Sequence, residues 1–284
     1  MQPSPRIVDR VIDAALAEDL GAGDITSRAV IPVGARFAGV IEAREPLVLA
    51  GLEIARLVFT RLAPEMTWQP LAFDGDHLTA GATLARLEGP ARRLLSAERT
   101  ALNLLQHLSG IATLTAAYVE RIAGTGAVLL DTRKTIPGLR ELAKYATRMG
   151  GAQNHRLRLD DGVLVKDNHL AVCGSVTEAL RRARAAGLTD IEVECDNLDQ
   201  VREALEAGAP RLLLDNMDNA TLRRAVEMAR GRAATEASGG VNLETIRGIA
   251  ETGVEFISVG RITQSAPAVD IGLDWTALDQ PSRA

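Results

Sequence analysis

The only three lysines of this chain, against 29 arginines, fall within 33 residues: Lys134, Lys144 and Lys166. Such a preference for arginine suggests that lysine is kept where a generic surface cation would not serve. Lysine is a compact point charge that can approach a phosphate or give up its proton, whereas arginine is a permanently charged planar fork. Lys134 and Lys166 each end an apolar, strand-like run, which favours a functional role. Lys144 lies inside an amphipathic helical pattern, which favours a structural role.

Short apolar runs that end in a polar or glycine residue recur from residue 127 onward. They span residues 127–131, 162–166, 191–195, 211–215, 234–238 and 255–259. Helical patterns lie between most of them, over residues 176–186, 198–207, 219–229 and 243–252. Three of these connections close with glycine, which is a helix C-cap signal. The repetition predicts right-handed βαβ units, a parallel sheet covered on both faces, and a barrel of about six or seven such units.

The residues at the ends of these runs are the candidates for chemistry, because a parallel barrel carries its active site at the carboxyl ends of its strands. The first two ends supply cations, the next two carboxylates and the last two small residues with backbone donors. The candidates are Thr132, Arg133, Lys134, Lys166, Glu194, Asp215, Ser238, Gly239, Gly240, Val259, Gly260 and Arg261. Cations and carboxylates around one opening fit a polyanion bound with a hard divalent metal. Backbone N–H groups in the glycine loops fit a phosphate.

Each candidate also has a structural explanation when taken alone. Asp215 could cap the helix that follows it, and the segment 238–240 could be an ordinary tight turn. His155 could be a buried structural histidine, and Arg99 would be a solvated helix residue in most proteins. The joint pattern is stronger than any single member.

Bulk composition predicts a globular protein that binds a small anionic ligand. A chain of 284 residues can form one large or two ordinary domains. The net charge of -5 and the 3% aromatic content argue against nucleic acid. No run is long enough to span a bilayer, and the N-terminus lacks the apolar core of a signal peptide. Cys173 and Cys195 lack metal-ligand spacing, so we expect two small buried side chains in a reducing cytoplasm.

The N-terminal part has a different pattern. Residues 6–18 predict an amphipathic helix, and a second helix over 54–62 lies between alternating stretches at 37–49 and 71–87, which predict antiparallel strands. Pro90 begins a long helical stretch that reaches about residue 107 and resumes through 123. We place a domain boundary near Ser109. The expected domains are 1–109 and 110–266, with the tail 267–284 returning to the first domain as an edge strand.

Several long motifs resemble the quinolinate phosphoribosyltransferase family, the carboxylating nicotinate-nucleotide pyrophosphorylases. Residues 131–170 contain DTRKT-x-PG-x-R and VKDNH, which are specific signals. Further matches are AEDLGAGDIT, GPARRLLSAERTALNLLQHLSGIAT, LLLDNM, SGG and ISVG, so the resemblance covers nearly the whole chain. It implies an N-terminal α/β sandwich followed by an open, incomplete parallel α/β barrel. It also implies a homodimer in which each sandwich covers the partner's barrel.

The resemblance implies transfer of the phosphoribosyl group of 5-phosphoribosyl-1-pyrophosphate to quinolinate, with Mg²⁺ as cofactor. The products are nicotinate mononucleotide, carbon dioxide and pyrophosphate, in de novo NAD biosynthesis. By the family pattern the residues that contact quinolinate are Arg133, His155, Arg156 and Lys166, with Arg99 reaching in from the other subunit. Lys134, Glu194 and Asp215 match positions that hold the phosphoribosyl pyrophosphate and its metal. The loops 238–240 and 259–261 match those around the 5-phosphate, with Thr132 as a further substrate contact.

The sequence departs from the common family pattern in places. Arg261 and Ile262 stand where Ala and Leu are usual, Gln264 stands where His is frequent, and Ala152 replaces a third glycine. Three other functions remain alternatives: the related protein found with molybdate transport genes, a Schiff-base aldolase with Lys166 as the nucleophile, and a non-catalytic binding module. The VKDNH motif disfavours the first, the surrounding arginines and carboxylates the second, and the intact charged set the third.

Overall fold

The computed structural model describes residues 2–276, and contacts within the chain divide it into two compact units. The first unit comprises Met1–Leu114, Ile136–Gly150 and Ser265–Ala284, and the second comprises Thr115–Thr135 and Gly151–Gln264. This division differs from the expected one, because the chain passes between units near residue 114, and residues 136–150 belong to the first unit. None of the helices in the described residues is long and apolar enough to cross a membrane.

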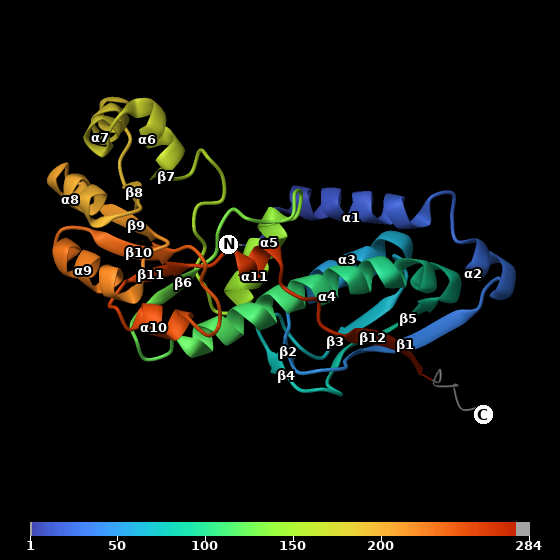
Figure 1. The fold of residues 1–284 in the computed structure, drawn as a ribbon. Coiled ribbons are helices and arrows are strands. Elements are labelled where there is room, and N and C mark those ends of the chain that lie inside the picture. Colours follow the sequence, from blue (N-terminus) through green and yellow to red (C-terminus); the bar gives the residue numbers. More distant parts are fainter. Residues whose placement is uncertain (1, 277–284) are drawn as a thin grey trace. The chain divides into compact units, whose positions relative to one another are not determined.

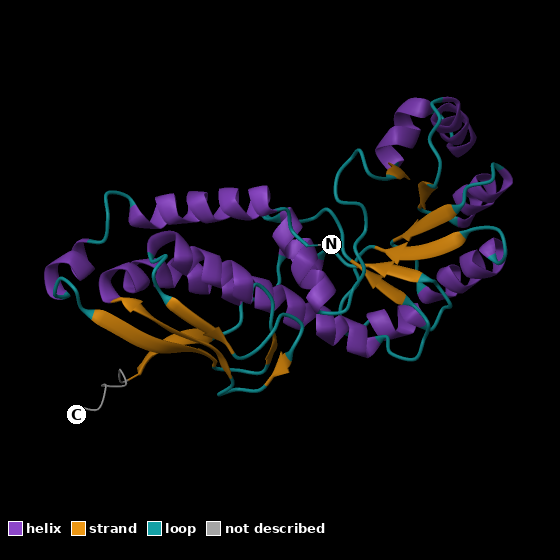
Figure 2. Cartoon of the chain, turned by 180° about the vertical axis from the view of Figure 1, so that it is seen from behind, coloured by secondary structure: helices purple, strands orange, loops and turns teal. Residues whose placement is uncertain are grey.

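The first unit is built around a four-stranded antiparallel sheet in the order β12-β1-β5-β3. Its strands are β1 (Arg36–Ala43), β3 (Thr67–Pro70), β5 (Thr83–Pro90) and β12 (Ile271–Thr276), and a small second sheet pairs β2 (Leu47–Val48) with β4 (His77–Leu78). Helices α1 (Pro5–Leu20), α3 (Leu52–Leu62) and α4 (Ala91–Arg121) lie along one face of the larger sheet, and α2 (Ile25–Val30) follows α1 (Figures 1 and 2). Strand β12 is at the sheet edge, as predicted for the tail, while residues 277–284 of that tail lie outside the described residues.

Local sequence explains why helix α1 forms where it does. Pro5 occupies the first turn, where its missing N–H is not needed, and Gly21 ends the helix with a positive φ of 48°. The buried residues Val8, Val11, Ile12 and Leu16 repeat at helical spacing, so one face of α1 is covered.

Helix α4 is continuous, and this corrects the interruption expected after residue 107. The Ser109-Gly110 pair does not break the helix, because each residue serves a close contact. Ser109 Oγ accepts from Ala50 N at 3.1 Å and donates to Ala50 O at 3.2 Å. A Cβ on Gly110 would lie 2.0 Å from Pro267 O, so only glycine fits where the returning tail crosses the helix.

The second unit holds a six-stranded parallel sheet in the order β6-β11-β10-β9-β8-β7. The strands are β6 (Val128–Leu130), β7 (Val163–Val165), β8 (Ile191–Cys195), β9 (Arg211–Asp215), β10 (Ala234–Ser238) and β11 (Phe256–Ser258). Every predicted barrel strand is confirmed. Strands β6 and β7 are consecutive in the chain yet stand at opposite edges, so the sheet is open between them.

Helices cover the outside of this parallel sheet (Figure 1). They are α6 (Asp167–Cys173), α7 (Val176–Ala185), α8 (Leu198–Glu206), α9 (Asn219–Ala229) and α10 (Ile246–Ala250), and the short α11 (Arg261–Gln264) follows β11 apart from this layer (Figure 1). Helix α9 has the predicted bounds, with Asp218 accepting from Thr221 N at 2.7 Å as its N-cap. Helix α10 is shorter than the predicted 243–252. All five residues of β8 are buried, as expected for a strand with both faces covered.

Helix α5 (Arg140–Met149) belongs to the first unit, although Lys134 and His155 on either side of it in sequence belong to the second. The Tyr145 hydroxyl donates to Asp74 Oδ2 at 2.6 Å, and Ser4 N donates to Glu141 Oε2 at 3.0 Å. These bonds connect α5 to two other parts of the first unit. Lys144 is buried in this helix, in keeping with a structural role.

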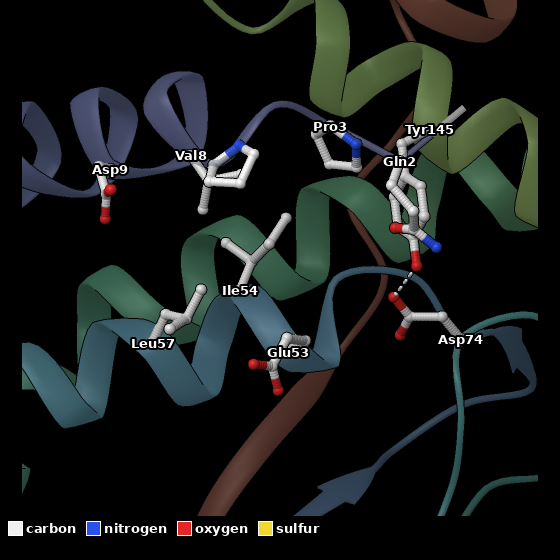
Figure 3. A pocket seen from close by; sticks show the side chains of 10 residues that line it. Gln2, Pro3, Val8, Asp9, Glu53, Ile54, Leu57, Asp74 and Tyr145 are labelled. Carbon is white, nitrogen blue, oxygen red and sulfur yellow. Dashed lines mark hydrogen bonds between the residues drawn. The ribbon is translucent and has the colours of Figure 1, made fainter.

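A cavity of about 360 Å³ lies beside Tyr145 in the first unit (Figure 3). Its lining residues are Gln2, Pro3, Pro5, Val8, Asp9, Glu53, Ile54, Leu57, Asp74 and Tyr145. The carboxylates among them already have partners. Asp74 accepts from Gly51 N and Leu52 N at the start of α3, Glu53 pairs with Arg56, and Asp9 pairs with Arg61. The cavity therefore has the character of a structural gap.

Candidate active site

All candidate residues except Arg99 lie in the second unit, and apart from His155 and Arg156 they stand at or near the carboxyl ends of the parallel strands. Strand β6 leads to Thr132, Arg133 and Lys134, and the remaining strands lead to Lys166, Glu194, Asp215, Ser238–Gly240 and Val259–Arg261. Strand register aligns neighbouring ends: Asp215 is opposite Ser238, and Ser258 is opposite Leu130. The parallel sheet therefore brings to one rim residues that are far apart in sequence.

Lys166 forms an ion pair with Glu194 across the ends of β7 and β8. Lys166 is 45% exposed, whereas Glu194 is only 9% exposed, so the lysine presents its charge to solvent above a buried carboxylate. The backbone N of Lys166 donates to His169 Nδ1 at 2.9 Å, which fixes the start of α6. His169 is thus part of the helix cap, and the Lys166 ammonium group pairs with Glu194.

A second group at the rim consists of the carboxylates of Glu194, Asp196 and Asp215, whose ligand atoms lie within 4.8 Å of one another. Glu194 and Asp215 are the predicted metal ligands, and Asp196 joins them from the exposed end of β8. Oxygen donors at this spacing suit a hard divalent cation such as Mg²⁺. The chemistry of this donor set therefore fits the metal that the sequence predicts.

The turn after β9 and the glycine loop after β10 are packed together. Asn216 has a positive φ of 54°, donates from Nδ2 to Asp215 Oδ2 at 2.5 Å, and donates from its backbone N to Ser238 O at 2.9 Å. A Cβ on Gly239 would lie 2.2 Å from Asn216 Oδ1, so the loop requires glycine there. This close packing indicates that residues 238–240 are not an ordinary tight turn that tolerates substitution. It also fixes the backbone N–H groups of this loop beside Asp215.

The backbone of Lys134 is bonded to helix α11, which follows β11. Its backbone carbonyl accepts from Thr263 Oγ1 at 2.7 Å, and Thr132 Oγ1 accepts from the Lys134 N–H at 3.0 Å. Lys134 itself is exposed. These bonds fix the backbone that carries Lys134 while its ammonium group stays accessible at the rim.

His155 is fixed by the end of β6. Gln153 forms a parallel bridge with Leu130, which extends the edge of the sheet. The Asp131 carboxylate, fully buried, then accepts from His155 N at 2.9 Å and from Asn154 Nδ2 at 2.6 Å. Arg156 follows, and its guanidinium NH1 donates to Gly162 O at 3.0 Å. The loop from β6 to β7 is thus built so that His155 and Arg156 face the sheet.

Two buried acids complete the surroundings of His155. His155 Nε2 lies 3.0 Å from Glu192 Oε2 and 3.7 Å from Glu236 Oε2, and these glutamates are only 4% and 0% exposed. Neither glutamate is among the residues predicted from sequence. The available signal was an acid at every second position of the apolar strand IEVEC, because residues 192 and 194 must point to the same face of the sheet.

Profiles of known protein families match both parts of the chain. Residues 24–109 match the quinolinate phosphoribosyl transferase N-terminal domain, and residues 111–274 match the C-terminal domain of that family. The chain belongs to the quinolinate phosphoribosyltransferase family.

Individual relatives agree over nearly the full length of the chain. A nicotinate-nucleotide pyrophosphorylase [carboxylating] of Mycobacterium leprae is 46% identical, over 93% of this chain and 95% of its own length. A probable enzyme of the same name from Bacillus subtilis is 42% identical, over 95% and 94%. The crystal structure of nicotinate-nucleotide pyrophosphorylase from Ehrlichia chaffeensis has a TM-score of 0.92 at 41% identity, covering 97% of this chain and 100% of that chain.

The resemblance described above predicts that Arg99 of one subunit reaches into the site of the other. In this chain Arg99 is exposed on α4, in the first unit, and its role in the site stays a prediction. Arg261, which departs from the family pattern, is exposed at the start of α11. Of the two cysteines, Cys195 is buried as predicted and Cys173 only partly so. Burial raises the pKa of the Cys195 thiol to about 12, so this cysteine is no nucleophile at neutral pH.

Burial raises the pKa of Glu236 to about 7, with the negative charge of Glu192 adding to the effect and His155 opposing it. Because the folded pKa lies above the usual value of 4.5, the folded state binds this proton more tightly than the unfolded chain does. The stability that results is fully present below pH 4.5 and is lost as the pH rises through about 7.

Replacing Glu236 by glutamine should remove this loss. We expect the melting temperature of Glu236→Gln to exceed that of the wild type increasingly between pH 5 and pH 8, because the amide cannot ionise. At the upper end of this pH range, the free energy of unfolding of the variant should exceed that of the wild type by on the order of a few kcal/mol. Thermal unfolding across that pH range measures it, with the exposed Glu206→Gln on α8 as the control. Parallel pH profiles for wild type and Glu236→Gln would show that Glu236 does not hold the proton.

Proposed function

We propose that the chain transfers the phosphoribosyl group of 5-phosphoribosyl-1-pyrophosphate to quinolinate with loss of carbon dioxide, giving nicotinate mononucleotide and pyrophosphate for NAD biosynthesis. The observation that carries this proposal is the rim of the parallel sheet, where cation-bearing strand ends adjoin the group Glu194, Asp196 and Asp215. Family membership and the printed names of full-length relatives support the same reaction.

The cations of the rim supply recognition of a dicarboxylate. Quinolinate carries two adjacent carboxylates, and the planar forks of Arg133 and Arg156 can each grip a carboxylate with two parallel hydrogen bonds. Burial lowers the pKa of Arg156, and Arg133 nearby adds to the effect, so these cations stand close enough to repel each other. A bound dianion relieves that repulsion. Lys166 can then pair either with a carboxylate of the substrate or with Glu194.

The carboxylate group would hold Mg²⁺ together with water and the pyrophosphate oxygens, which is how proteins usually bind this ion. The chemistry supplied by bound Mg²⁺ is neutralisation of negative charge on the departing pyrophosphate. Lys134 adds a second cation on this side. The glycine loop 238–240 and the loop 259–261 offer backbone N–H groups to the 5-phosphate.

The reaction needs positioning and charge placement rather than a covalent enzyme intermediate. The pyridine nitrogen forms a bond to ribosyl C1 while the C1–oxygen bond to pyrophosphate breaks, through an oxocarbenium-like state. The ring becomes a pyridinium. The bond to the neighbouring carboxylate then breaks, carbon dioxide leaves, and the electron pair stays on the ring carbon beside N⁺ until a proton adds there.

A homodimer and a cytoplasmic location are part of the proposal. The dimer rests on the family resemblance, which assigns Arg99 to the partner's site. The cytoplasm is supported by two cysteines that form no disulfide, as is usual in a reducing compartment.

The decisive assay is incubation with quinolinate, phosphoribosyl pyrophosphate and Mg²⁺, with carbon dioxide and nicotinate mononucleotide as readouts. We expect turnover with quinolinate and little with nicotinate, which lacks the second carboxylate. Without that anion, part of the cationic cluster stays desolvated and uncompensated, which costs several kcal/mol. Nicotinate turned over at a comparable kcat/KM would contradict the assignment of the cations to a dicarboxylate.

A further inference from the structure

A short parallel ladder joins the end of β6 to residues 153–155. Gln153 N donates to Leu129 O at 2.9 Å, and Asp131 N donates to Gln153 O at 3.2 Å. In a regular parallel pair the next bond runs from His155 N to the backbone carbonyl of Asp131, because the bonds of such a ladder follow one another at even spacing. At this position His155 N donates to Oδ1 of the Asp131 carboxylate at 2.9 Å. The ladder thus continues from backbone to side chain at Asp131.

The other oxygen of the Asp131 carboxylate binds the same segment. Asn154 Nδ2 donates to Asp131 Oδ2 at 2.6 Å, and Asp131 is fully buried. A carboxylate can accept at both oxygens, and its charge makes each bond shorter and stronger than a bond between neutral groups. A buried carboxylate is costly unless donors compensate it, so the two chain segments are held together wherever both donors are present. We call this pair of side chains the Asp131–Asn154 clamp.

The clamp stands two residues before each of the arginines assigned to the dicarboxylate. Arg133 follows Asp131 by two positions, and Arg156 follows Asn154 by two positions. Burial lowers the pKa of Arg156, and the positive charge of Arg133 lowers it further, so the two guanidinium groups are close to each other. Arg156 Nη1 also donates to Gly162 O at 3.0 Å. The clamp is thus placed to set the separation of the two guanidinium groups.

We propose that the two residues of this clamp are positioning residues, which fix the spacing of Arg133 and Arg156 and thereby favour a substrate with two adjacent carboxylates. The inference rests on the proposed function for the substrate, but the clamp itself can be tested without it. Two guanidinium groups grip two carboxylates in bidentate fashion only where their separation matches that of the anions. A misplacement of about 1 Å can cost on the order of a hundredfold. Asp131 and Asn154 act through the arginines and need no contact with the substrate.

A reversal of the polarity of one hydrogen bond tests the clamp. In Asn154→Asp, two carboxylates face each other across 2.6 Å and repel. In the double variant Asp131→Asn/Asn154→Asp the partners exchange roles, because the amide oxygen at position 131 can accept from His155 N while its NH₂ group donates to the new carboxylate. The double variant also has the net charge of the wild type. Gln153→Glu adds the same negative charge as Asn154→Asp at an exposed neighbouring residue and serves as the matched control.

The expected kinetic result is a loss that the second substitution repairs. We expect the KM for quinolinate to rise roughly ten- to a hundredfold in Asn154→Asp, because the two arginines are no longer held at the spacing of the dianion. The value of kcat and the KM for phosphoribosyl pyrophosphate should stay within about threefold, as expected when a contact made equally in the ground state and the transition state is lost. The double variant should return the KM for quinolinate to within about threefold of the wild type, because the coupled partners compensate each other. Gln153→Glu should behave like the wild type.

Melting temperatures measured without substrate give an independent readout. Asn154→Asp should melt below the wild type, and the double variant should regain most of that loss. If the double variant has a KM for quinolinate as high as that of Asn154→Asp, the clamp does not position the arginines and the proposal is wrong. Equal losses for both substrates would also overturn it, because they indicate a general structural defect, and a matching loss in Gln153→Glu would mean that added charge alone is the cause.

A wild-type protein that neither binds quinolinate in calorimetry nor turns it over would contradict the proposed function, and the role of the arginines would fail with it. The melting temperatures of Asn154→Asp and the double variant would then still decide whether the clamp holds the two chain segments together.

Discussion

We expect a chelator in excess to abolish turnover, and Mg²⁺ but not Zn²⁺ to restore it. This result is expected because Glu194, Asp196 and Asp215 offer only carboxylate oxygens, the donors that Mg²⁺ prefers, whereas Zn²⁺ favours nitrogen and sulfur ligands. Asp215→Asn keeps the shape of the side chain and removes its charge. We expect kcat to fall about 10²–10³-fold, the usual cost of losing one electrostatic contact to a transition state.

A matched control is Asp199→Asn on α8. Asp199 is exposed, and its carboxylate forms an ion pair with Arg202 on the same helix. It should retain wild-type activity and the same Mg²⁺ requirement. Full turnover in excess chelator, after dialysis against the same chelator, would refute the metal assignment. Loss of activity in both aspartate variants would point to a general charge effect.

Activity should reappear when two inactive variants are mixed. Arg99→Ala and Lys166→Ala each damage every site of their own homodimer, if Arg99 serves the partner's site. In a mixed dimer one site then carries both lesions and the other carries none. Random pairing makes half of the dimers mixed, so recovered activity should approach about a quarter of the wild-type value.

Subunit exchange must be confirmed separately, for example by mass spectrometry of differently labelled chains. Arg93→Ala, an exposed arginine near the start of α4 that pairs with Glu65, serves as the matched control and should be active without mixing. A mixture that exchanges subunits yet stays inactive would show that Arg99 acts within its own chain or lies outside the site.

Much of the fold could be predicted because its signals are local. Strands such as Ile191–Cys195 are apolar runs bounded by polar residues, and helix α9 begins at an aspartate cap and buries residues at helical spacing. The N-terminal unit was less predictable in detail. The Ser109-Gly110 pair reads locally as a helix break, but tertiary contacts with Ala50 and Pro267 require those small residues inside a continuous helix.

Candidate residues could be predicted from the sequence where they stand at or next to the end of a strand. Residues deeper inside a strand were missed. Lys166, Glu194 and Asp215 follow from that rule, and the structure brings them to one rim. Glu236 lies two residues before the end of its strand in ATEAS, where sequence alone does not reveal a neighbouring histidine. The contact with His155 depends on a loop more than 80 positions away, and only the folded sheet brings the two together.

Helix α5 has a consequence for how this protein could be divided or rebuilt. The chain leaves the barrel after Thr135, builds α5 into the first unit, and returns at Gly151. The segments of the two units therefore alternate along the sequence, and neither unit is a single continuous stretch of the chain. A fragment that begins at the apparent boundary near residue 110 would carry the mostly buried helix 140–149 without its Tyr145 partner Asp74 and without Ser4. Exchange of catalytic halves between relatives would need to transfer residues 136–150 with the N-terminal part, so recombination breakpoints suit positions 135 and 151 better than position 110.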